Sequence, residues 1–146
     1  RLVEDVISRN REAIELEGVN VFFQPMDVPR VAGVASLLHQ AVLNLILNGC
    51  SAMREGGEIF LRVLESTYRG SSAVVIEVTD TGVGISEAAI PRIFRPYVST
   101  TEGGTGLGLP TTLRIIRLHG GTILVESEPG QGSRFSIVLP AEGSTQ

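Results

Sequence analysis

Glycines follow each of the three helices that the sequence predicts, and a strand follows each glycine. This repeated order of helix, glycine and strand, together with the total of 17 glycines, predicts a compact, loop-rich domain that contains both helices and strands. The helices are expected at residues 2–17, 36–54 and 107–118, and the glycine stops are Gly18, Gly56-Gly57 and Gly120-Gly121. The strands are expected at residues 19–24, 58–65, 73–79, 122–127 and 133–139.

Composition narrows the class of protein. The chain has 146 residues and is 42% hydrophobic, which is enough for one domain with a buried core. Its net charge is −4 with no arginine-rich block, so non-specific binding to nucleic acid or to an anionic membrane is not expected. The single Cys50 excludes an internal disulfide framework and a cysteine-based zinc cluster, and suits a reducing compartment.

The chain is interpreted as a fragment of a longer protein. It does not begin with methionine, and it opens inside a predicted helix. As a separate point, no apolar run in this chain approaches the roughly 20 residues that span a bilayer. The expected domain is residues 1–140, and residues 141–146 are expected to be a disordered tail. Membrane segments or sensor domains upstream are left open.

Two asparagines lie one helical turn apart on the second predicted helix. Asn44 and Asn48 would project from the same side, and an amide oxygen is a neutral, hard ligand suited to Mg²⁺. A solvated polar face of an amphipathic helix explains the same pattern. It does not explain why two glycine loops follow.

The first glycine loop is Asp80-Thr-Gly-Val-Gly-Ile85, directly after a predicted buried strand. A carboxylate there could accept a hydrogen bond from the exocyclic amine of adenine, which guanine lacks at that position. Gly82 and Gly84 would let a flat base approach the backbone. The alternative is a plain turn between two elements.

The second glycine loop, Gly104-Thr-Gly-Leu-Gly-Leu109, leads into a helix. Unhindered N–H groups and the positive end of the helix dipole make an anion site there. The GxGxG spacing differs from the GxGxxG of dinucleotide folds, and no P-loop motif occurs. The alternative is a helix N-terminus that merely needs small residues.

The remaining chemically active side chains are predicted to be structural. His39 is flanked by apolar residues, and His119 precedes a helix-ending Gly-Gly pair. Neither histidine has a nucleophile or a second metal ligand beside it in sequence. Cys50 lies near the apolar face of its helix and is interpreted as a packing residue.

In this order the motifs resemble those of sensor histidine kinases. Residues 38–49 (Leu-His-Gln-Ala-Val-Leu-Asn-Leu-Ile-Leu-Asn-Gly) resemble the N box, and residues 80–85 the G1 box. Residues 93–97 (Ile-Phe-Arg-Pro-Tyr) resemble the F box and residues 104–109 the G2 box. Residues 118–123 and 126–135 are similar to the last strands of the same domain.

The resemblance implies the Bergerat fold of gyrase, Hsp90 and MutL. That fold is an α/β two-layer sandwich in which helices cover one face of a mixed β-sheet. It further implies ATP and Mg²⁺ as ligands, with Asn48 on the metal, Asn44 beside the phosphates and Asp80 on the adenine amine. The other residues that the resemblance assigns to nucleotide binding are Ser51, Gly82, Gly84, Ile85, Gly104, Thr105, Gly106, Leu107, Gly108 and Ser133.

The sequence departs from the family pattern in its basic residues. Family members often carry lysine or arginine after the F box or one turn beyond the magnesium asparagine, where this chain has Ser99 or Thr101, and Ser51. Phosphate charge would then be balanced by Mg²⁺, backbone N–H groups and Arg95. Residues 97–104 would form the mobile lid.

The resemblance implies a catalytic domain that transfers the γ-phosphoryl of ATP to a histidine. That histidine would lie on an adjoining dimerisation domain, since neither histidine here has the expected setting, and a response regulator receiver domain would take the phosphoryl next. No nucleic acid and no direct membrane contact are expected. The location would be cytoplasmic, including the cytoplasmic part of a membrane-bound sensor. Alternatives are a nucleotide-gated binding module, a pseudokinase of the same fold and an anti-sigma-type serine kinase.

Overall fold

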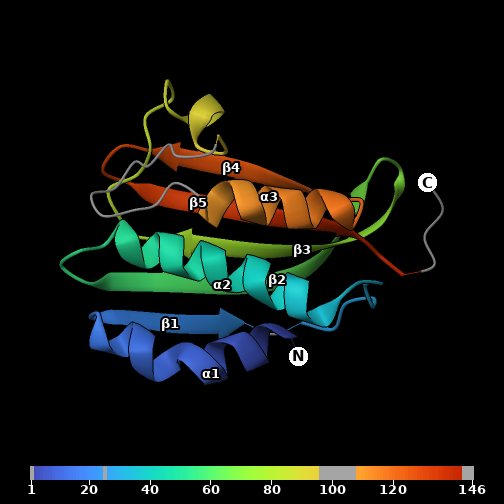
Figure 1. Cartoon of the computed structure of the whole chain (residues 1–146), viewed down its shortest axis with the longest axis horizontal. Helices are drawn as coiled ribbons and strands as arrows, with labels where there is room; N and C mark the ends of the chain where they lie inside the picture. The colour runs from blue at the N-terminus through green and yellow to red at the C-terminus, as the bar shows by residue number, and fades with distance from the viewer. Residues whose placement is uncertain (1, 25, 96–107, 143–146) are drawn as a thin grey trace.

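The computed structural model describes residues 2–24, 26–95 and 108–142. Each of its three α-helices is followed by a strand, as the glycine stops predict (Figure 1). In order they are α1 (Leu2–Leu16), β1 (Val19–Gln24), α2 (Ala35–Ser51), β2 (Gly57–Tyr68), β3 (Ser71–Asp80), a 3₁₀ turn η1 (Ile90–Arg92), α3 (Gly108–Leu118), β4 (Thr122–Glu128) and β5 (Gly132–Pro140).

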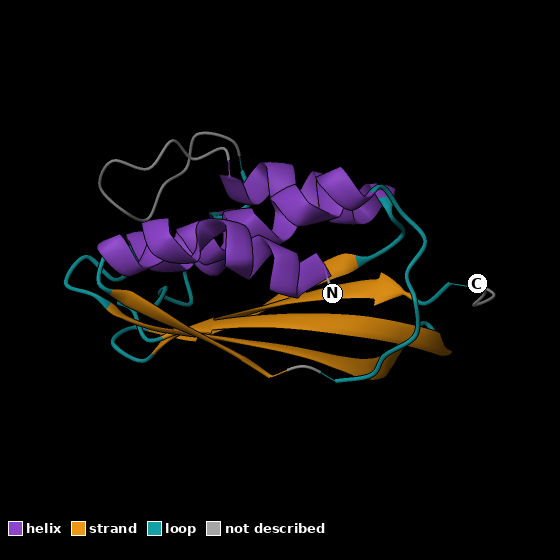
Figure 2. Ribbon diagram, turned by 90° about the horizontal axis from the view of Figure 1, so that it is seen from below, coloured by secondary structure: helices purple, strands orange, loops and turns teal. Residues whose placement is uncertain are grey.

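The strands form one mixed sheet in the order β1-β2-β3-β5-β4. Strands β1 and β2 are parallel, and the other neighbours are antiparallel. Figure 2 shows α1, α2 and α3 as a single layer on one side of this sheet. The prediction of a two-layer sandwich with one covered face is therefore confirmed. We call the side under the helices the covered face and the other side the open face.

The core lies between the helices and the covered face. On α2 the buried residues recur at helical spacing, as predicted, and Phe135 and Ile137 on β5 oppose them at 1% and 0% exposure. The buried residues of α2 are Leu38, Ala41, Val42, Leu45, Ile46, Gly49 and Cys50.

Helix α2 ends at Ser51, three residues before the predicted end at residue 54. The carbonyl of Ala52 accepts a hydrogen bond from the N–H of Val83 (3.2 Å) instead of continuing the helix. Gly56 then has φ +88° and packs against the backbone of Gly18. The helix therefore ends directly before the residue whose carbonyl binds the first glycine loop.

The β2–β3 hairpin is longer than the sequence predicts. Its two turn residues, Arg69 and Gly70, both have positive φ (53° and 79°), a pairing that suits tight hairpin turns. Arginine is not a usual signal for such a turn, so strand ends were predicted at residues 65 and 73. Pairing instead continues to Tyr68 and Ser71.

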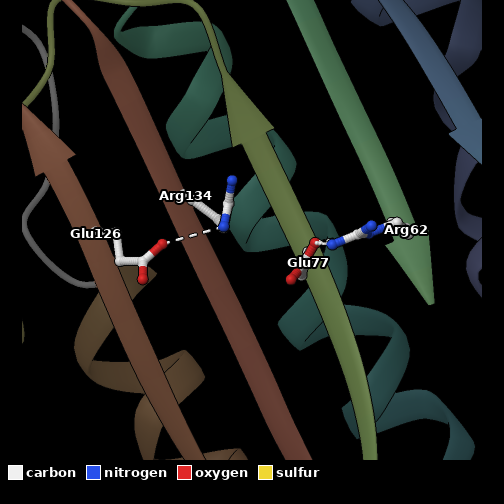
Figure 3. A network of polar contacts seen from close by, with 4 residues as sticks. All are labelled: Arg62, Glu77, Glu126 and Arg134. Atoms are coloured by element: carbon white, nitrogen blue, oxygen red, sulfur yellow. Dashed lines mark hydrogen bonds and ion pairs between the residues drawn. The ribbon is translucent and has the colours of Figure 1, made fainter. Parts of the chain in front are cut away.

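The open face carries charged side chains on the strands β2, β3, β5 and β4. Figure 3 shows Arg62 beside Glu77 and Arg134 beside Glu126, four side chains from four neighbouring strands. Towards the β1 edge, Phe22 and Phe60 stack with ring centroids 5.3 Å apart. No helix in the described part of the chain is long and apolar enough to cross a membrane.

The chain stays attached to the sheet beyond Pro140. Ala141 is buried and donates its N–H to the carbonyl of Ser72 (3.0 Å), and the N–H of Glu142 bonds the carbonyl of Arg30. The predicted boundary at residue 140 thus falls two residues before the last described residue. Residues 143–146 of the predicted tail lie outside the described residues.

Candidate functional site

The centre of the site is a buried carboxylate at the end of β3. Asp80 is 4% exposed, and its Oδ1 accepts the N–H of Gly82 at 2.8 Å. Burial raises the pKa of this carboxyl, while N–H groups of Gly82 and Ser133 oppose the rise. A carboxylate held in this way is a good acceptor for a ligand N–H group, because burial strengthens the hydrogen bond.

Three glycines leave space for the backbone around Asp80. A Cβ at Gly49 would lie 3.3 Å from the Cβ of Asp80, and one at Gly82 would lie 2.9 Å from its Oδ1. A Cβ at Gly132 would collide with the carbonyl oxygen of Asp80. Because these glycines come from α2, the first loop and β5, three separate segments converge on one carboxylate.

The first glycine loop is fixed to the end of α2 and to the start of β2. The N–H of Val83 reaches Ala52, as described above. The hydroxyl of Thr81 accepts the N–H of Glu58 (3.1 Å) and lies 3.4 Å from the sulfur of Met53. The loop is therefore held from two sides before any ligand binds.

Ser127 fixes the far end of the same loop, and sequence reasoning missed it. Its hydroxyl accepts the N–H of Ile85 (2.8 Å), donates to the carbonyl of Gly132 (2.9 Å) and lies 2.7 Å from the hydroxyl of Ser133. Strand alternation places Ser127 on the same side as Ile123, which could have identified it as an inward-facing hydroxyl. Ser133 itself is buried opposite Asp80 in the β3–β5 ladder.

Gly84 is the second glycine of the loop and packs on the β4–β5 turn. It has φ +76°, and a Cβ there would collide with the carbonyl oxygen of Glu128. One residue earlier, the carbonyl of Val83 accepts the N–H of Gly130 at 2.7 Å. Glycine is therefore needed at position 84 because two stretches of backbone, the first glycine loop and the β4–β5 turn, approach each other closely.

The two asparagines lie on α2, the helix that also brings Gly49 close to Asp80. Both are half-buried, and Asn44 Nδ2 is 3.5 Å from the carbonyl oxygen of Gly108, where α3 begins. Asn48 precedes Gly49, where an added Cβ would lie 3.3 Å from the Cβ of Asp80, and Ser51 is exposed at the end of the helix. Of the second glycine loop, the structure describes Gly108 and Leu109. The predicted lid at residues 97–104 lies outside the described residues, and so do Gly104, Thr105, Gly106 and Leu107.

No cluster of three or more histidine, cysteine, aspartate or glutamate side chains is found among the described residues. The side-chain amide of Asn48 makes no hydrogen bond to another described residue. Its neutral amide oxygen is a type of ligand that fits Mg²⁺, which keeps most of its own water and takes few protein ligands.

His119 and Cys50 have structural surroundings, as predicted, and the structural role predicted for His39 stays a prediction. His119 bonds the backbone on both ring nitrogens, and Nε2 of His39 is buried without a partner among the described residues. Cys50 is buried, and desolvation, with Glu17 nearby, raises the pKa of its thiol to about 11. A thiol in that state is a poor nucleophile.

Comparison with known proteins agrees with this geometry. A family profile for histidine kinase-, DNA gyrase B-, and HSP90-like ATPases matches residues 33–143. Sporulation kinase C of Bacillus subtilis (strain 168) is 40% identical over 123 residues, which are 84% of this chain and 28% of that protein. This chain therefore spans less than a third of that relative.

Two solved structures share the fold. The nucleotide-free catalytic domain of histidine kinase ThkA has a TM-score of 0.80 at 30% identity, over 96% of this chain and 90% of that one. Full-length ShkA in complex with AMPPNP has a TM-score of 0.80 at 29% identity, over 96% of this chain and 29% of that one. The resemblance drawn from the sequence boxes, including the Bergerat fold, is confirmed. The chain belongs to the family of histidine kinase-, DNA gyrase B- and HSP90-like ATPases.

Proposed function

We propose that this chain is the ATP-binding catalytic domain of a two-component sensor histidine kinase. The observation that carries the proposal is Asp80, a buried carboxylate with no cation beside it among the described residues and with glycine backbone around it. A buried charge is costly unless a partner compensates it, and two backbone N–H groups do so only in part. The amine of adenine would supply the further donor.

The phosphates and the metal would lie between α2 and the start of α3. Asn48 would ligate Mg²⁺, and Mg²⁺ would supply charge neutralisation on the phosphate oxygens. Asn44 would stand beside the phosphates, where hydrolysing relatives carry a glutamate. An amide is not a general base, which favours transfer to a histidine over activation of water. Ser51, Ile85 and Ser133 would complete the binding site, with Gly104, Thr105, Gly106, Leu107 and Gly108 around the phosphates.

The reaction would move one phosphoryl group. The bond from the γ-phosphorus to the bridging oxygen breaks and leaves ADP, while a bond forms to a ring nitrogen of a histidine on the dimerisation domain of the same protein. A response regulator receiver domain would then accept the phosphoryl. We propose a cytoplasmic location for the domain, including the cytoplasmic part of a membrane-bound sensor. In such transfer most catalysis comes from positioning and charge stabilisation, which is the kind of site that the fixed loop and the amides provide.

Calorimetric titration of the chain with ATP, with and without Mg²⁺, tests the binding step. We expect binding in both cases and tighter binding with Mg²⁺. The transfer step is tested by adding a separately purified dimerisation domain and γ-labelled ATP. An acid-labile phosphohistidine supports the proposal, whereas acid-stable phosphoserine or fast ATP hydrolysis without an acceptor would replace it with a serine kinase or a nucleotide-gated module. Absence of any ATP binding would reject it.

A further inference from the structure

His119 joins the end of α3 to the beginning of α2. Its Nε2 lies 3.1 Å from the backbone nitrogen of Val34, and its Nδ1 lies 2.8 Å from the carbonyl oxygen of Ile115. A backbone nitrogen can only donate, so Nε2 is the acceptor. The neutral ring then carries its proton on Nδ1 and donates it to Ile115.

This bond serves a helix end that has no cap of its own. Val34 is the N-cap residue of α2, and its side chain cannot accept a hydrogen bond. His119 therefore supplies, from another helix, an acceptor at the start of α2. Gly33 makes the approach possible, because a Cβ there would collide with Cδ2 and lie 2.7 Å from Nε2 of the imidazole.

The same two helices meet again near the predicted phosphate site. There Asn44 on α2 faces the carbonyl of Gly108, which also accepts a bond from the hydroxyl of Thr112 at 2.7 Å. Thr112 is fully buried. Both ends of α3 are thus joined to α2 by polar contacts, its start to Asn44 in the middle of α2 and its end, through His119, to the start of α2.

We propose that His119 is a positioning residue that sets α2 against α3 and so places Asn44 and Asn48 for the metal and the phosphates. The inference rests on the proposed function. Loss of the His119 bond frees the start of α2, and a small shift of the helix moves both asparagines together. Asp80 lies on β3 and keeps its own backbone contacts, so adenine binding does not depend on His119. The part of the ATP affinity that depends on Mg²⁺ does require the His119 bond.

The bond itself is tested in the wild-type chain without nucleotide. The chain has only two histidines, so nitrogen NMR correlations at alkaline pH assign both rings with ease. We expect His119 to carry its proton on Nδ1 and to leave Nε2 unprotonated as the acceptor of the Val34 N–H. A proton on Nε2 overturns the proposal.

The role is tested by titration with ATP in the presence and absence of Mg²⁺. In His119→Phe, which keeps the ring but loses the acceptor, we expect the Kd for Mg-ATP to rise about fivefold and the Kd for metal-free ATP to change less than about twofold. Gly33→Ala, which blocks the approach with His119 intact, is expected to give the same pattern. His119→Gln keeps an acceptor that reaches Val34 and is expected to restore the wild-type response to Mg²⁺.

The outcomes separate this inference from the proposed function. His39→Gln is the control, because Nε2 of His39 has no partner among the described residues, and it should leave both Kd values unchanged. Equal losses with and without Mg²⁺ in His119→Phe, or no rescue by His119→Gln, overturn the positioning role. Absence of ATP binding by every variant and by the wild type rejects the proposed function instead, while the NMR result still decides the contact.

Discussion

The two faces of the sheet hold their carboxylates in different ways. On the open face, Glu77 of β3 lies 2.8 Å from Nη2 of Arg62 and accepts a bond from its Nε at 2.9 Å (Figure 3). On the covered face, Asp80 lies three residues further along the same strand and makes no ion pair with any described residue. One acid is neutralised by a cation at the surface, and the other is buried with backbone N–H groups alone.

The difference indicates which acid serves stability and which serves binding. A surface ion pair contributes little to stability, and this one is open to water on its Arg62 side, where the side chain is 52% exposed against 14% for Glu77. A buried acid without a cation is kept at a cost in stability, and groups with perturbed pKa values in such surroundings cluster at functional sites. The fold accommodates the buried Asp80 because glycines let three backbone segments approach this residue closely.

The largest expected effect comes from adding one methyl group at the Asp80 end of β3. Gly84 and Gly70 lie beyond the two ends of this strand with similar φ, +76° and +79°. Alanine at either position is strained by about 1 kcal/mol. Gly84→Ala also drives a Cβ into the Glu128 carbonyl, so we expect it to lower the free energy of unfolding by about 3 kcal/mol or more.

Chemical denaturation of both variants measures this difference. Gly70→Ala is the matched control, because nothing lies within 4 Å of the added Cβ. Equal losses in the two variants would mean that the loop at Gly84 moves freely, and that the close approach at the Asp80 end does not constrain it.

The next largest effect concerns ATP affinity. Asp80→Asn replaces the buried carboxylate by an amide of the same shape, which removes a charged acceptor. A hydrogen bond to a charged group is worth about 2 kcal/mol, so we expect Mg-ATP to bind about 30-fold more weakly by calorimetry. Glu77→Gln removes the other carboxylate of β3 and should leave the affinity unchanged. Similar affinities for the two variants would contradict the division of roles between the faces.

Much of this site was predicted from the sequence because its parts are local. Asp80 follows an alternating strand, and Asn44 and Asn48 are one turn apart, so each could be identified within a short window. The pattern also placed β1 at residues 19–24, where the structure has it. Such features depend on neighbours in the chain, which a sequence displays directly.

The missed parts depend on contacts between distant segments. Gly132 meets Asp80 only because β5 pairs with β3, and Ser127 of β4 contacts Ile85 of the first glycine loop, which is 42 residues away in the chain. His119 contacts Val34 from 85 residues away. The pattern of the sequence shows that these residues are small or polar, but not which backbone group each one meets.

A pair of serine variants compares the two faces of the sheet by the loss of a single hydroxyl group, with Ser127→Ala on the covered face. The change removes an acceptor for the N–H of Ile85 and a donor to the carbonyl of Gly132 on the covered face. Leaving such groups unpaired costs about 1–3 kcal/mol, so we expect a loss of about 2 kcal/mol in thermal or chemical unfolding. The control is Ser136→Ala on β5, whose side chain points to the open face, and its expected change is within about 0.5 kcal/mol. Equal effects would remove the special role of Ser127.

The pH dependence of stability should differ in sign from that of an ordinary paired acid. Burial raises the pKa of Asp80 above 3.8, so between that pH and the raised value the folded chain binds more protons than the unfolded chain. The free energy of unfolding therefore falls as pH rises through this window. Asp80→Asn should remove that fall, and Glu77→Gln should not. Parallel pH profiles for wild type and Asp80→Asn would show that Asp80 is not perturbed by burial.

The smallest effect is expected for the open-face pair. Both Arg62 contacts reach the same oxygen, Oε1 of Glu77, so the pair lacks the two parallel bonds of a strong arginine–carboxylate fork. The Arg62 side chain is 52% exposed and solvated. A double-mutant cycle with Arg62→Gln and Glu77→Gln should give a coupling of about 0.5 kcal/mol that shrinks in high salt. A coupling above about 2 kcal/mol would show that the open face, like the covered one, holds its carboxylate in surroundings that exclude water.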